Sequence, residues 1–144
     1  MKILVDTSVW SEGLRRKKKS INSSEVFISK LITNDELIVL TGIILQEILS
    51  GIKDEKLFCE IRDILSGFEI IEPNVDDYIY AAELRNKLQK KGVSATTVDV
   101  LIASLAIRKN FYLATYDNDF VNISKIDKKL KLLDPEKYSR ISKK

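Results

Sequence analysis

Short, continuous apolar runs alternate along this chain with segments in which apolar residues recur at helical spacing. Residues 2–5 form a short, nearly continuous apolar run that ends at the polar triplet Asp6-Thr7-Ser8, as expected of a strand buried on both faces. Four later runs of the same kind predict strands at residues 36–40, 69–72, 111–114 and 130–133.

Between these runs, apolar residues recur at the spacing of helices. The polar triplet opens one helix, and others are predicted at about residues 26–33, 42–52, 54–65, 75–91 and 97–110, with a short helical piece near Phe120. Ser23 or Ser24 can cap the helix over residues 26–33, and Gly92 ends the helix that begins at Val75. Strands that alternate with helices predict an α/β sandwich with a mainly parallel central sheet flanked by helices.

Length and composition fit one domain that covers residues 1–144. The apolar content of 44% and the charged content of 31% are ordinary for a globular protein of 144 residues. Residues 136–144 form a basic tail that is expected to be mobile. Lys and Arg number 24 against 21 Asp and Glu, and the net charge of +3 permits a polyanionic partner without requiring one.

Cysteine usage and the apolar runs indicate the compartment. Cys59 is the one cysteine, so no intramolecular disulfide can form, which is typical of a reducing compartment. The first apolar run stops at Asp6, too soon for a signal peptide, and no run approaches the roughly 18 residues that a membrane span needs. We therefore expect a soluble, cytoplasmic protein with no membrane partner.

The chain contains no histidine. Imidazole is therefore excluded as general base, general acid and metal ligand, which removes Ser-His-Asp and Cys-His hydrolysis and zinc sites that depend on histidine. Any hydrolysis must use carboxylates, together with metal that they bind.

Several acidic residues stand where predicted strands end. Asp6 follows the first strand, and Asp117 and Asp119 follow the strand over residues 111–114. Ligands of parallel α/β sheets bind outside the carboxyl ends of the strands, so these positions predict a site. The alternatives are a helix cap for Asp6 and an Asx turn for Asp117.

Two more acidic residues lie on apolar faces of predicted helices. Glu47 has Ile43 and Ile44 one turn before it and small residues one turn after it. Asp99 shares a face with Ile102 and Ala103, and a preceding threonine already provides the cap. Alternatively, Glu47 is a boundary residue whose carboxylate reaches water. Asp99 could likewise lie at the start of its helix only because its charge interacts favourably with the helix dipole.

The acids are more informative together than separately, because this fold brings strand ends and helix starts to one crevice. Clustered carboxylates cannot all stay ionised and unpaired, and they bind hard divalent cations such as Mg²⁺ or Mn²⁺. The sequence therefore predicts a metal site.

These segments resemble the PIN-domain family, and within it the VapC toxins of toxin–antitoxin modules. The most specific match runs from Val98-Asp99-Val100-Leu101-Ile102-Ala103 to Thr115-Tyr116-Asp117-Asn118-Asp119-Phe120. Leu4-Val5-Asp6-Thr7-Ser8-Val9 and Gln46-Glu47-Ile48 fit two further family segments in the family's order.

The resemblance implies a PIN-like three-layer sandwich whose catalytic, metal-binding acids are Asp6, Glu47, Asp99 and Asp117. It adds Asp119 as a less certain fifth ligand, and Thr7 and Thr115 as nearby hydroxyls. It further implies a Mg²⁺- or Mn²⁺-dependent endoribonuclease that hydrolyses structured RNA such as transfer or ribosomal RNA. A homodimer and inhibition by a VapB-like antitoxin are implied as well.

A basic segment, Arg15-Arg16-Lys17-Lys18-Lys19, closely follows the first acid. It either binds the RNA backbone through charge or is a solvated loop. For the whole protein, the alternatives are a PIN nuclease of RNA processing outside any toxin–antitoxin pair and a catalytically silent RNA-binding or scaffold module.

Overall fold

The computed structural model describes residues 1–18, 27–135 and 137–138, without the side chains of residues 15–18. Its elements, in chain order, are β1 (Lys2–Val5), α1 (Thr7–Lys18), α2 (Phe27–Thr33), β2 (Leu37–Leu40), α3 (Gly42–Ser50), α4 (Glu55–Leu65), β3 (Glu69–Ile70), α5 (Val75–Lys90), α6 (Thr97–Lys109), β4 (Tyr112–Ala114), α7 (Asn118–Ile126) and β5 (Lys131–Leu133). The expected caps Ser23 and Ser24, and most of the tail over residues 136–144, lie outside the described residues.

Within the described part of the chain, five strands form one sheet in the order β3-β2-β1-β4-β5. Each neighbouring pair is parallel, with Leu4 of β1 opposite Val39 of β2 and Leu113 of β4. Ile3, Leu4 and Val5 are fully buried, which explains why β1 is a continuous apolar run with no polar alternation. The predicted α/β sandwich with a parallel sheet is confirmed.

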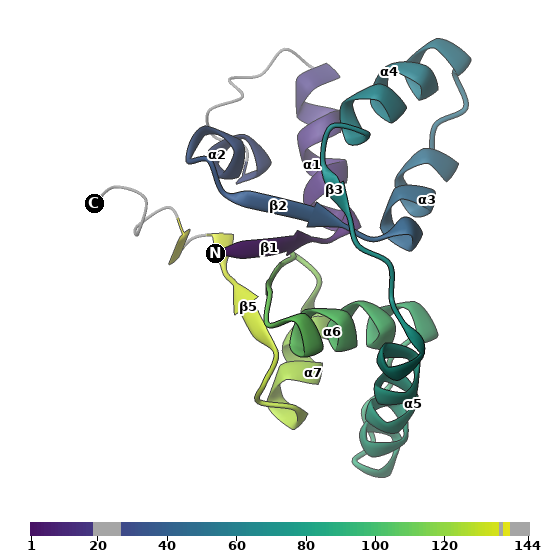
Figure 1. Cartoon of the computed structure of the whole chain (residues 1–144), viewed down its shortest axis with the longest axis vertical. Helices are drawn as coiled ribbons and strands as arrows, with labels where there is room; N and C mark the ends of the chain where they lie inside the picture. Colours follow the sequence, from purple (N-terminus) through teal and green to yellow (C-terminus); the bar gives the residue numbers. More distant parts are fainter. Residues whose placement is uncertain (19–26, 136, 139–144) are drawn as a thin grey trace.

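Helices cover both faces of the sheet. In Figure 1, α1 to α4 lie on one side and α5 to α7 on the other. The chain therefore builds the sheet outward from β1 in one direction, to β2 and β3, and then in the other, to β4 and β5. This reversal lies between β1 and β4, where parallel α/β folds form their binding crevice at the carboxyl ends of the strands.

β3 and α7 differ in length from the prediction. β3 contains only Glu69–Ile70, although Ile71 N still donates to Leu40 O at 2.7 Å, because the chain leaves the sheet ahead of Pro73. The helical piece near Phe120 is a helix of nine residues, α7, which buries Phe120 and Ile123 against the core. None of the helices in the described residues is both long and apolar enough to span a membrane.

Candidate metal centre

Asp6 follows β1 and is buried, with 7% of its surface exposed. Its backbone N–H donates to Ala114 O at 3.0 Å, which joins the ends of β1 and β4. Its carboxylate atom Oδ2 accepts from Ser8 Oγ and from Thr115 Oγ1, each at 2.9 Å. Two hydroxyls, one in the segment after β1 and one in the segment after β4, therefore fix the orientation of this buried carboxylate.

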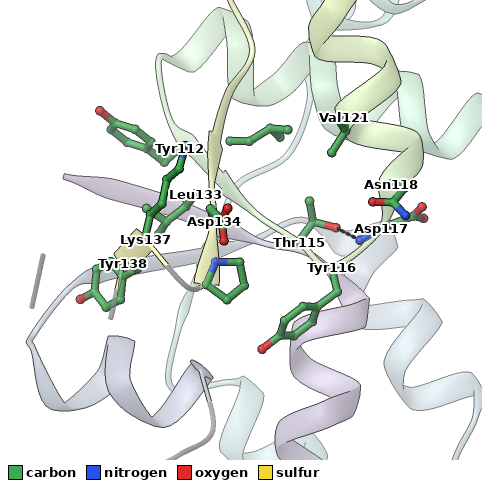
Figure 2. A pocket seen from close by; sticks show the side chains of 12 residues that line it. Tyr112, Thr115, Tyr116, Asp117, Asn118, Val121, Leu133, Asp134, Lys137 and Tyr138 are labelled. Carbon is green, nitrogen blue, oxygen red and sulfur yellow. Dashed lines mark hydrogen bonds between the residues drawn. The ribbon is translucent and has the colours of Figure 1, made fainter. Parts of the chain in front are cut away.

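Thr115 and Ser8 also hold the segment after β4. Thr115 Oγ1 accepts from Asp117 N at 3.0 Å, as the dashed line in Figure 2 shows. Ser8 Oγ accepts from Tyr116 N at 3.0 Å. Ser8 is a site residue that the sequence does not predict, although Asp6 and Thr7 of the same triplet are predicted. Its position two residues after a strand-end aspartate, within reach of that carboxylate, was the available signal.

Asp99 lies in the first turn of α6, but it does not cap the helix. Thr96 is the cap and accepts from Asp99 N at 3.0 Å, as the sequence indicated for Thr96 or Thr97. The half-buried carboxyl of Asp99 has a raised pKa, because burial disfavours its charge. The Thr96 hydroxyl opposes this rise, whereas the charges of Asp117, Asp119 and Asp6 add to it.

Asp117 and Asp119 approach Asp99 from the start of α7. Among the described residues, one carboxylate oxygen from each of Asp99, Asp117 and Asp119 can be chosen so that all lie within 4.8 Å of one another. Asp117 also caps α7, since its Oδ1 accepts from Asp119 N at 2.9 Å. Asp117 therefore forms the Asx turn and also lies close to Asp99 and Asp119.

Glu47, in α3, lies near Thr7, Asp6 and Asp99. Thr7 Oγ1 donates to Glu47 Oε1 at 3.5 Å. The pKa of Glu47 is raised, first by partial burial of the carboxyl, although the residue as a whole is exposed, and then by the Asp6 charge. Thr7 opposes this rise and Asp99 adds to it, so Glu47 is electrostatically coupled to acids from two other segments.

The structure therefore brings the five predicted acids near one another, because Asp99, Asp117 and Asp119 lie close together and both Asp6 and Glu47 are electrostatically coupled to Asp99. We call these residues the acid cluster: Asp6, Glu47, Asp99, Asp117 and Asp119. The three most closely spaced carboxylates include that of Asp119, which the family resemblance implies only as a less certain fifth ligand. A set of carboxylate and hydroxyl oxygens without nitrogen or sulfur fits Mg²⁺ or Mn²⁺, because hard cations prefer oxygen ligands.

The basic segment is only partly described. Residues 15–18 form the end of α1, while their side chains and Lys19 lie outside the described residues. Its role in RNA binding stays a prediction.

Comparison with known proteins agrees with this geometry. Residues 3–126 match the family model for the PIN domain. The chain belongs to the PIN-domain family. The VapC ribonuclease Mb1587 of Mycobacterium bovis and the ribonuclease VapC11 of Mycobacterium tuberculosis are each 33% identical to it over 129 residues, which cover 86% of this chain and 92% of theirs.

Solved structures of VapC-containing complexes have the same fold. In the crystal structure of VapBC2 from Rickettsia felis bound to a DNA fragment from their promoter, the matched chain is 28% identical and superposes with a TM-score of 0.72, covering 92% of this chain and 98% of that one. VapBC-1 from nontypeable Haemophilus influenzae gives a TM-score of 0.74 at 19% identity, over 94% of this chain and 99% of that one. At that identity, the second match supports the fold alone.

Proposed function

We propose that this PIN-domain protein is a metal-dependent endoribonuclease of the VapC toxin type. The observation that carries the proposal is the approach of Asp6, Glu47, Asp99 and Asp117 to one another from four separate segments. Relatives at 33% identity are named ribonucleases. A catalytically silent module would have no need to retain this set.

Some side chains would bind the divalent ion, and others would orient its ligands. Asp99, Asp117 and Asp119 provide three closely spaced carboxylates, and Asp6 after β1 and Glu47 in α3 are electrostatically coupled to Asp99. Ser8 and Thr115 hold Asp6 in one orientation, as residues around a metal's ligands commonly do. A bound Mg²⁺ or Mn²⁺ would supply a water of lowered pKa and stabilise negative charge on the scissile phosphate.

Substrate and partners follow from the family resemblance. We infer that the substrate is structured RNA such as transfer or ribosomal RNA, that a VapB-like antitoxin inhibits the enzyme, and that the protein forms a homodimer. The matched structure from Rickettsia felis, at 28% identity, is a complex named VapBC2, which supports the antitoxin. The free, exposed thiol of Cys59 fits a protein of the reducing cytoplasm. An adjacent antitoxin gene would distinguish a toxin from a PIN nuclease of RNA processing.

Cleavage of structured RNA is expected to require Mg²⁺ or Mn²⁺ and to stop in EDTA, because water activation and charge stabilisation depend on the ion. Incubation of purified protein with labelled RNA, with metal and with excess EDTA, tests this. Products should carry a 5′-phosphate and a 3′-hydroxyl, since water attacks rather than the RNA's own 2′-hydroxyl. Products that end in a 2′,3′-cyclic phosphate would contradict hydrolysis by water.

Charge reversal of Arg15 to Lys19 is expected to weaken RNA binding and to flatten its salt dependence, because fewer counterions are released from the phosphates. The slope of log affinity against log salt should decrease in magnitude by about 0.7 to 0.9 for each phosphate that the variant no longer neutralises. Filter binding over a salt series measures this slope, and Mn²⁺ binding should stay unchanged. An unaltered slope would identify the segment as a solvated loop.

A further inference from the structure

A cavity of about 520 Å³ adjoins the acid cluster at the ends of β4 and β5 (Figure 2). Its walls include Thr115 and Asp117, which belong to the metal centre, and three tyrosines, Tyr112, Tyr116 and Tyr138. We propose that this cavity binds the base of an unpaired nucleotide beside the scissile phosphate, and that Tyr116 is the surface on which the base stacks. The inference rests on the proposed ribonuclease function.

The size and position of the cavity suit this ligand. Pockets for small organic groups measure about 300–1,000 Å³ and combine aromatic walls with a few polar groups. Because Thr115 and Asp117 belong to both sites, a nucleotide in the cavity would directly neighbour a phosphate at the acids. One RNA strand can therefore occupy both the cavity and the acid cluster.

The three tyrosines of the cavity have different surroundings. Tyr138 is 3% exposed, and its hydroxyl accepts from Asn34 Nδ2 at 3.0 Å. The ring of Tyr112 is covered by the ammonium of Lys131, which lies 4.6 Å from the ring centroid. Tyr116 is 42% exposed. Tyr116 is therefore the ring with the most surface to offer a base.

Tyr116 is also held in a fixed relation to the acid cluster. Its backbone N–H donates to Ser8 Oγ, and Ser8 in turn donates to Asp6. Its hydroxyl donates to Glu12 Oε1 at 3.2 Å, and its ring meets the edge of Phe27 at a centroid separation of 6.2 Å. A ring fixed at both ends loses little conformational entropy on stacking, which favours binding.

The lining combines aromatic and polar side chains, which suits the ring and the polar edge of a base. Asn118 adds an amide that can both donate to and accept from a base edge. A base reaches such a cavity only when it is unpaired, as in RNA loops and bulges. The cavity thus predicts cleavage next to unpaired nucleotides.

The test compares an RNA hairpin that carries an unpaired loop with a blunt duplex of the same stem. Binding is measured by fluorescence anisotropy in EDTA on an Asp99→Asn background, which prevents cleavage and removes one repulsive charge. The loop RNA should bind more tightly than the duplex. Adding Tyr116→Ala should weaken loop binding about five- to a hundredfold, the range expected for loss of one stacked base, and leave duplex binding little changed.

Controls separate stacking from damage to the fold. Tyr116→Phe keeps the ring and should keep the preference for loop RNA. Tyr78→Ala removes a tyrosine of similar exposure, 54%, on the distant helix α5, and should leave the preference unchanged. Should Tyr116→Ala unfold, Tyr116→Leu retains bulk against Phe27 without an aromatic face and serves the same comparison.

Equal affinity for loop and duplex, or an unchanged preference after loss of the Tyr116 ring, would overturn the proposal. The second result is also the one expected if the cavity holds a segment of a protein partner instead of RNA. A different result would contradict the proposed ribonuclease function, namely that the wild-type protein with Mg²⁺ does not cut RNA. A loop preference that depends on Tyr116 can still be observed in that case.

Discussion

Asp99→Asn is expected to melt at a higher temperature than the wild-type protein in EDTA, and to lose most of the stabilisation that Mg²⁺ or Mn²⁺ gives the wild type. The carboxyl of Asp99 has a raised pKa because burial and the charges of Asp117, Asp119 and Asp6 oppose its ionisation. At neutral pH this repulsion destabilises the folded state. Asparagine keeps the shape and removes one charge, so the folded state gains stability without metal.

Each kcal/mol gained corresponds to about 4 °C in melting temperature for a domain of this size. A cation that binds only the folded state stabilises the wild type by mass action, and the variant should gain much less. Thermal melts of both proteins, with and without metal, measure the two effects.

Asp76→Asn provides a matched control. Asp76 also lies in the first turn of a helix, α5, and is exposed. Loss of its favourable interaction with the helix dipole should slightly lower stability, with no change in metal response. If Asp99→Asn behaves like Asp76→Asn and melts below the wild type in EDTA, Asp99 serves the helix rather than a metal.

The difference between wild type and Asp99→Asn in EDTA should also depend on pH. Because the folded-state pKa of Asp99 is above its ordinary value of 3.8, the destabilisation is fully present above the raised pKa. As the pH falls from the raised pKa toward the ordinary value, the folded state takes up the proton first, and the penalty disappears. The two melting temperatures should therefore converge on acidification, and a gap that widens would contradict this.

Thr115→Val is expected to reduce Mn²⁺ affinity and RNA cleavage about 10- to 100-fold, the range seen when a residue that orients a metal ligand is lost. Valine matches the shape of threonine but removes the hydroxyl that donates to Asp6 Oδ2 and accepts from Asp117 N. Thr115 is buried, so the unpaired groups should also cost about 1–3 kcal/mol of stability.

Thr115→Ser is the matched variant, because it keeps the hydroxyl and loses only a methyl group. It should retain Mn²⁺ affinity and cleavage close to wild type. Calorimetric Mn²⁺ titration and cleavage rates of the three proteins test the account. Full activity in Thr115→Val would show that the hydroxyl does not orient the acid cluster.

Much of the fold could be predicted because its signals are local. The apolar run of β1 follows from burial on both faces of the strand, and the helical period of α5 follows from burial of one stripe of the helix. Asp6, Asp99 and Asp117 could be proposed for the site because strand ends and helix starts of a parallel sheet meet at one edge. The family resemblance then indicated that these acids bind a metal.

Other features depend on distances between segments, which a sequence does not contain. The approach of Asp119 to Asp99 arises from where α7 starts relative to α6. The bond from Ser8 to the Tyr116 backbone links positions that are 108 residues apart. The cavity beside Tyr116 requires β4, β5 and the chain after β5 together, and no local period indicates it.

We propose that carboxylates from four segments form one metal site that cuts RNA. This proposal is tested most directly by measuring, on the same samples of wild type and Asp99→Asn, Mn²⁺ binding by electron paramagnetic resonance and cleavage of structured RNA. We predict that the wild type binds Mn²⁺ and cuts the RNA to 5′-phosphate products, and that Asp99→Asn does neither while remaining folded. Cleavage by folded Asp99→Asn at the wild-type rate, or by the wild type in EDTA, would contradict the account.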